Sequence, residues 1–128
     1  DLKHIEQRYR ERIATQTPLV PDTTVEADFE QRRPPLEVTD ASRALARTAQ
    51  VIYAELGRAL TVDESGTGGG TDAAFAAASG KLAVAESFGL IGNGFHSSDE
   101  EYVDLDSIEP RLYLLVRLIM EISRASNE

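Results

Sequence analysis

Residues 66–102 read GTGGGTDAAFAAASGKLAVAESFGLIGNGFHSSDEEY, and this stretch decides the expected fold. It opens with a glycine loop and continues into a small-residue helix predicted over 71–79. An apolar run and a second glycine-bearing loop follow, and this second loop carries His96. Polar, glycine-rich loops at both ends of a buried helix and strand are a common way for an α/β protein to build a site. The stretch is therefore expected to contribute to a functional site.

The composition is that of an ordinary globular chain. With 128 residues, 41% hydrophobic and 27% charged, the chain can form one modest domain with its own core. Its formal net charge of −9 would repel a phosphate backbone, so no nucleic acid partner is expected. No apolar run is long enough to span a bilayer, so no membrane partner is expected either. The absence of cysteine excludes disulfides, thiolate nucleophiles and cysteine-ligated zinc, and leaves the compartment open.

Two elements are predicted before the glycine loop is reached. Residues 1–15 have apolar side chains at helical spacing, which predicts an amphipathic helix. Residues 23–30 alternate apolar and acidic side chains, which predicts a strand buried on one face. No other early segment could pair with this strand, so its sheet partners are expected outside the chain. Residues 1–35 are accordingly interpreted as the tail of a domain that begins earlier, with the Arg33-Pro34 step at the junction.

The rest of the chain, 36–128, alternates predicted helices and strands. A helix capped by Thr39 or Asp40 precedes short strands over 61–64 and 82–86. Asp106 or Ser107 is expected to cap a last helix. Its apolar stripe at helical spacing consists of Ile108, Leu112, Leu115, Ile119 and Ile122. This alternation is typical of the α/β class.

The first glycine loop is open to two interpretations. Gly68, Gly69 and Gly70 lead into Thr71 at the start of a predicted helix, where bare backbone N–H groups could bind an anion or a developing oxyanion. The loop fits neither the P-loop pattern nor the full dinucleotide fingerprint. The alternative is a tight strand-to-helix turn in which only glycine fits.

Two further side chains could carry chemistry. His96 could serve as a metal ligand or as an acid or base, although a lone loop histidine is more often a surface residue. Arg33 could clamp a substrate carboxylate with two parallel hydrogen bonds, or it could simply end the strand. The carboxylates near His96 could complete a metal site or form a solvated turn. A zinc site needs at least three protein ligands, so any companions of His96 would lie upstream.

An ordered set of motifs resembles the C-terminal part of glutamate carboxypeptidase. The wider family includes zinc-dependent acetylornithine deacetylase, succinyl-diaminopimelate desuccinylase, and related aminoacylases and peptidases. The match is dense from residue 61 onward and looser over 1–60, and Leu82 stands where the pattern usually has proline. The matching motifs are Gly68-Gly69-Gly70-Thr71-Asp72-Ala73, Gly80-Lys81, Glu86-Ser87-Phe88-Gly89, Gly94-Phe95-His96-Ser97 and Glu101-Tyr102-Val103.

The resemblance implies a two-zinc hydrolase that cleaves the amide bond of N-acyl or peptidyl amino acids with metal-activated water. It implies that 36–128 belong to a three-layer α/β/α catalytic domain and that 1–35 end an α+β lid, which also forms a homodimer. The position of His96 is then a zinc ligand, and that of Arg33 contacts the substrate carboxylate. Gly68, Gly69, Gly70 and Thr71 line the substrate pocket.

The remaining zinc ligands and the general-base glutamate of such enzymes would all precede Asp1. The chain is thus interpreted as the C-terminal third or so of an enzyme, inactive alone. The alternative is a metal-free interaction or dimerisation module, or a pseudoenzyme half with the same fold. The unpartnered strand over 23–30 motivates this alternative, because an open strand edge invites another chain.

Overall fold

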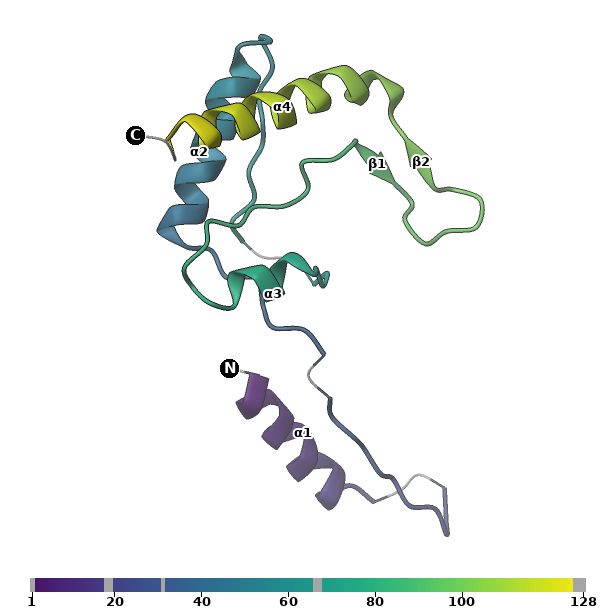
Figure 1. Cartoon of the computed structure of the whole chain (residues 1–128). Helices are drawn as coiled ribbons and strands as arrows, with labels where there is room; N and C mark the ends of the chain where they lie inside the picture. Colours follow the sequence, from purple (N-terminus) through teal and green to yellow (C-terminus); the bar gives the residue numbers. More distant parts are fainter. Residues whose placement is uncertain (1, 18–19, 31, 66–67, 126–128) are drawn as a thin grey trace. The chain divides into compact units, whose positions relative to one another are not determined.

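The computed structural model describes residues 2–17, 20–30, 32–65 and 68–125. The chain forms two compact units, Asp1–Arg32 and Arg33–Glu128, which are described separately. The first contains helix α1 (Leu2–Thr15) (Figure 1). The second contains α2 (Asp40–Ala54), α3 (Ala73–Ala77), strands β1 (Gly92–Asn93) and β2 (Tyr102–Val103), a 3-10 turn at Leu105–Ser107, and α4 (Ile108–Ala125). None of the described helices has the length and apolar character needed to cross a membrane.

The first unit consists of α1 and an extended segment. The predicted helix is confirmed, and an ion pair between Glu6 and Arg10 (2.8 Å) spans one turn of its surface. The Tyr9 ring lies 6.0 Å from the Phe29 ring, and the Arg10 guanidinium carbon lies 5.1 Å from the Phe29 ring centre. Residues 23–30 form no ladder with any described segment, so the strand predicted there, whose sheet partners are expected outside the chain, stays a prediction. A strand exists only where a neighbour completes its ladder.

The core of the second unit lies between α2 and α4. Thr39 caps α2 as predicted: its hydroxyl accepts from the Ser42 N–H (3.1 Å), and the Ser42 hydroxyl accepts from the Thr39 N–H (2.8 Å). The buried apolar cluster consists of Ala49, Ile52 and Tyr53 from α2 and Leu114 and Leu118 from α4. Leu45, Leu60, Phe88 and Tyr113 pack around it. Removal of this apolar surface from water holds the two helices together.

The face of α4 that packs differs from the predicted face. Leu114 and Leu118 are buried against α2. The members of the predicted stripe are exposed to between 36% and 64%: Ile108, Leu112, Leu115, Ile119 and Ile122. The prediction of the packed face was wrong because α4 is apolar on more than one side. Periodicity alone cannot tell which of two apolar faces contacts α2.

The strands also differ from the prediction. Residues 61–64 and 82–86 form no strand, since no described segment hydrogen-bonds to them in a ladder. The sheet of the described residues is instead the antiparallel pair β1–β2, with Gly92 opposite Val103 and Asn93 opposite Tyr102. Helix α3 is shorter than the predicted 71–79, and Ala74 is its buried residue, so close packing on several sides is not observed. The regular structure of the described residues is thus mainly helical, with two short strands, and the three-layer arrangement stays a prediction.

Candidate functional site

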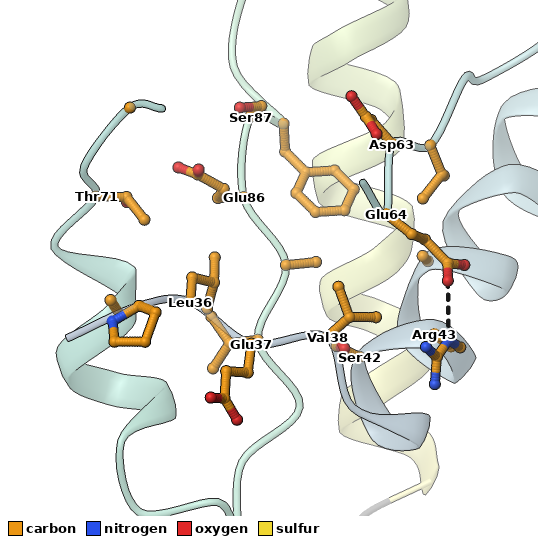
Figure 2. A pocket seen from close by; sticks show the side chains of 18 of the residues that line it. Leu36, Glu37, Val38, Ser42, Arg43, Asp63, Glu64, Thr71, Glu86 and Ser87 are labelled. Atoms are coloured by element: carbon orange, nitrogen blue, oxygen red, sulfur yellow. Dashed lines mark hydrogen bonds and ion pairs between the residues drawn. The ribbon is translucent and has the colours of Figure 1, made fainter. Parts of the chain in front are cut away.

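The second unit contains an open pocket of about 500 Å³ beside α2 (Figure 2). Three segments, 34–38, 61–64 and 84–88, form most of its wall. The segment 34–38 leads into α2, which contributes Ser42 and Arg43. The glycine loop and the start of α3 complete the lining with Gly69, Gly70, Thr71 and Ala74. The segments predicted as strands therefore wall the pocket although they form no ladder.

The charged side chains of the pocket wall are mainly acidic, since four carboxylates face a single arginine: Glu37, Asp63, Glu64 and Glu86 against Arg43. Arg43 donates from Nε to Glu64 (2.9 Å, drawn in Figure 2) and from Nη1 to Asp40 (3.0 Å). These hydrogen bonds, first that to Glu64 and then that to Asp40, raise the pKa of Arg43. Asp63 accepts from both the hydroxyl (2.6 Å) and the backbone N–H (2.8 Å) of Ser65, which lowers the pKa of Asp63. Both shifts favour the charged forms of Arg43 and Asp63, and the Arg43 cation is already paired with two carboxylates.

The glycine loop lies at one end of the pocket. Gly69, Gly70 and Thr71 line the cavity, whereas Gly68 faces open space and Gly66 lies outside the described residues. Neither Gly68 nor Gly70 has a φ in the left-handed region, so backbone strain does not require glycine at these two positions. The Thr71 hydroxyl accepts from the Ala73 N–H at 3.2 Å and supports the start of α3.

Arg33 lies against this loop. A Cβ built on Gly70 would lie 3.5 Å from Cδ and 3.6 Å from Nη1 of Arg33. The Arg33 Nε donates to Asp72 Oδ1 at 2.8 Å, a contact between residues 39 positions apart. Arg33 does not itself line the pocket, but its neighbour Pro34 and its contact Gly70 both do. Arg33 and the glycine loop, which the sequence nominated separately, therefore lie side by side.

His96 lies elsewhere, in the loop that joins β1 to β2. Its side chain is exposed and is not among the residues that line the pocket. Its φ of +69° places the residue in the left-handed region, directly after Phe95 and two residues after Gly94 (φ +70°). The Ser97 N–H donates to the Gly94 carbonyl at 2.9 Å and closes a tight turn around His96. The imidazole is thus presented to the surroundings by a strained, well-defined turn.

The base of this hairpin is held by Ser107. Its side chain is 2% exposed, and its hydroxyl accepts from the Ile91 N–H (3.0 Å) and donates to the Asp104 carbonyl. The Asp104 N–H donates in turn to the Ile91 carbonyl at 2.8 Å. Both ends of the hairpin are therefore tied to the turn that leads into α4.

The described residues do not by themselves form a zinc site. No group of three or more histidine or carboxylate side chains in this part of the chain is placed to hold a metal ion. A structural or catalytic zinc needs at least three protein ligands. The exposed imidazole of His96 could supply one such ligand.

Sequence reasoning missed two side chains of this region. Arg43 has no role in the sequence-based predictions, yet it lines the pocket. Asp72 was quoted only as part of a motif and has no predicted role, although it pairs with Arg33. The sequence signal at Asp72 is an aspartate shortly after a glycine loop. An aspartate in this position is typical of a helix N-cap, so the pattern predicts a helix start and not a pair with Arg33.

Comparisons with known proteins give one family. The family model of "Peptidase family M20/M25/M40" matches residues 4–121. Carboxypeptidase G2 from Pseudomonas sp. (strain RS-16) is 44% identical over 103 residues, which cover 80% of this chain and 24% of that protein. The chain thus spans about a quarter of the length of this relative. No solved structure matches the chain significantly.

Proposed function

This chain belongs to peptidase family M20/M25/M40, and we propose from this membership that it is part of a hydrolase that cleaves the amide bond of N-acyl or peptidyl amino acids. The similarity to a protein named a carboxypeptidase supports a substrate with a free carboxylate at the residue released. Because the matched region is a quarter of that relative, the activity is assigned to a longer parent protein that contains these residues.

The contact between Arg33 and the glycine loop is the observation that supports this proposal most. A guanidinium beside exposed backbone at the edge of a 500 Å³ pocket can bind a carboxylate with two parallel hydrogen bonds. Gly69, Gly70 and Thr71 then form a wall of the substrate pocket. Gly68, which precedes them in the loop, is proposed to line the same pocket when substrate is bound. These roles are those implied for the same residues by the family resemblance.

His96 is proposed as one zinc ligand of a two-zinc centre whose other ligands lie in the parent protein. When bound, the metal ions supply an activated water as the nucleophile, which suits a chain without a cysteine or an identified serine nucleophile. In this proposal 36–128 belong to a three-layer α/β/α catalytic domain, and 1–35 end an α+β lid that mediates homodimerisation. The chain alone is then inactive.

Replacement of His96 in the parent protein tests the proposal. His96→Ala is expected to abolish hydrolysis and to reduce the zinc content, measured by elemental analysis alongside activity on N-acyl amino acids. His4→Ala is the matched control, because His4 is exposed on α1 and outside the proposed site. A fully active His96→Ala variant with an unchanged zinc content would sink the assignment.

A second function is favoured by one feature of the first unit. Val25 is 61% exposed and Phe29 is 37% exposed on a segment that pairs with no described strand. A metal-free interaction or dimerisation module would use such an edge. Two zinc ions per chain in the parent protein would exclude this second function, whereas a parent protein that folds without metal and has no hydrolytic activity would favour it.

A further inference from the structure

The Asp72 side chain does not form the helix-capping hydrogen bond that its position predicts. It occupies the N-cap of α3, where an aspartate usually accepts a backbone N–H of the first helical turn, yet it makes no such bond. Thr71 supplies the local support instead, through its hydroxyl and the Ala73 N–H. The Asp72 carboxylate is thereby left to accept from the Nε of Arg33 at 2.8 Å.

We propose that Asp72 is a positioning residue that fixes the Arg33 guanidinium so that it binds the substrate carboxylate through Nη1 and Nη2. The inference rests on the proposed function, because it assumes that Arg33 contacts that carboxylate. It goes further by assigning Asp72 to carboxylate selectivity.

The ion pair with Asp72 occupies one hydrogen-bond donor of the Arg33 guanidinium and leaves the other donors available. A guanidinium carries five N–H donors in a rigid planar fork. Asp72 uses the one on Nε, and no described residue accepts from Nη1 or Nη2. The four remaining donors include the pair at the end of the fork, which matches the two oxygens of a carboxylate. Gly70 lies beside the same side chain, since a Cβ built on it would be in ordinary van der Waals contact with Cδ and Nη1 of Arg33.

The Arg33–Asp72 ion pair orients the guanidinium and adds little to the stability of the fold. The side chains of Arg33 and Asp72 are 52% and 81% exposed, and an ion pair this exposed contributes little to the free energy of folding. Without this ion pair, a long arginine side chain in solvent samples many rotamers. Binding of a carboxylate must then order the side chain, and the lost conformational entropy weakens binding. Removal of Asp72 should therefore weaken carboxylate binding and leave the fold intact.

Steady-state kinetics of the parent protein test the proposal. The substrate is the best of a panel of N-acetyl amino acids and dipeptides, paired with the same compound carrying a carboxamide in place of its carboxylate. Asp72→Ala is expected to raise KM for the carboxylate about ten-fold, with kcat within about two-fold, and to act little on the carboxamide. Asp72→Asn keeps an acceptor oxygen for Nε and is expected to restore part of the loss. Asp28→Ala, an exposed aspartate of the first unit, is the charge-matched control.

Arg33→Ala in the same assay distinguishes a failure of the role proposed for Asp72 from a failure of the proposed function. If Arg33→Ala removes the preference for the carboxylate but Asp72→Ala does not, the role of Asp72 is overturned and the proposed function stands. If neither variant changes the preference, or if the wild-type protein hydrolyses no member of the panel, the proposed function itself is overturned. Equal losses on carboxylate and carboxamide for Asp72→Ala, with a lowered thermal midpoint, would show a structural role and also overturn the inference.

Discussion

At the level of single residues, Gly94 is the position where the loop that carries His96 tolerates least change. Its φ is +70°, and a Cβ would collide with the backbone carbonyl of Glu100 across the loop. Gly94→Ala is therefore expected to lower the free energy of unfolding by roughly 1–3 kcal/mol. Urea denaturation followed by circular dichroism measures the change. Gly89→Ala is the control, since a Cβ added there would meet no atom within 4 Å and the φ of Gly89 is not positive.

Ser107 is the second residue whose replacement is expected to lower the free energy of unfolding. Ser107→Ala removes the acceptor of the Ile91 N–H and leaves that donor without its partner at the base of the hairpin. The expected cost is about 1–3 kcal/mol, because the hydroxyl is buried and water replaces it poorly. Thermal denaturation compares this variant with Ser98→Ala, which changes an exposed serine of the same hairpin. Equal midpoints for the two variants would contradict the structural role of Ser107.

The sequence could nominate candidate site residues but not their geometry. Glycine, arginine and histidine were nominated from their chemistry, and the structure brings Arg33 to Gly70. The partner of Arg33 could not be predicted, because an aspartate before a helix is typical of an N-cap. In addition, a contact between residues 39 positions apart leaves no local pattern in the sequence. The separation of His96 from the pocket lining is equally a product of the tertiary fold.

At the level of elements, an ionic link joins the packed helices. Arg117 of α4 donates to Glu55, which follows α2, from Nη2 (2.9 Å) and Nε (3.3 Å). The Tyr113 hydroxyl also donates to the Glu55 carboxylate. Arg117 first, and then Tyr113, lower the pKa of Glu55 below its ordinary value of 4.5.

This link predicts how stability depends on acid. Since the pKa of Glu55 is lower in the folded state than in the unfolded state, its contribution is full above the ordinary glutamate pKa and is lost as the pH falls through the lowered one. The difference in thermal midpoint between wild type and Glu55→Gln should therefore be constant near neutral pH and shrink in acid. Glu100→Gln is the charge-matched control, because Glu100 is exposed and forms no ion pair with the described residues. A Glu55→Gln difference that grows in acid would contradict this sign.

Helices were predictable at this scale and strands were not. The periods that predicted α1, α2 and α4 are local, and each helix satisfies most of its own backbone hydrogen bonds. The segments 23–30, 61–64 and 82–86 have strand-like composition, but a ladder needs a neighbour that composition does not supply. The short β1–β2 pair escaped prediction because glycine and asparagine in β1 carry no strand signal.

For the whole molecule, the two units should differ in local stability. The second unit has a buried core between α2 and α4, whereas the described side chains of α1 are exposed or half-buried. A helix of 14 residues with so little burial is marginal in water. Amide hydrogen exchange is therefore expected to be slow in α2 and α4 and fast in α1. Slow exchange in α1 that appears only at high protein concentration would instead support the interaction module, since association through the first unit would protect it.

The aromatic content of the α2–α4 contact has a practical consequence for spectroscopy. The chain has four tyrosines and no tryptophan, so tyrosine alone gives its intrinsic ultraviolet emission. Tyr9 and Tyr102 are more than half exposed, while Tyr53 is buried in the core and Tyr113 donates to a carboxylate. The latter two rings therefore sit in environments that exist only while the helices are docked. Near-ultraviolet circular dichroism can thus follow the docking of these helices without a label, against a nearly constant background from the two exposed rings.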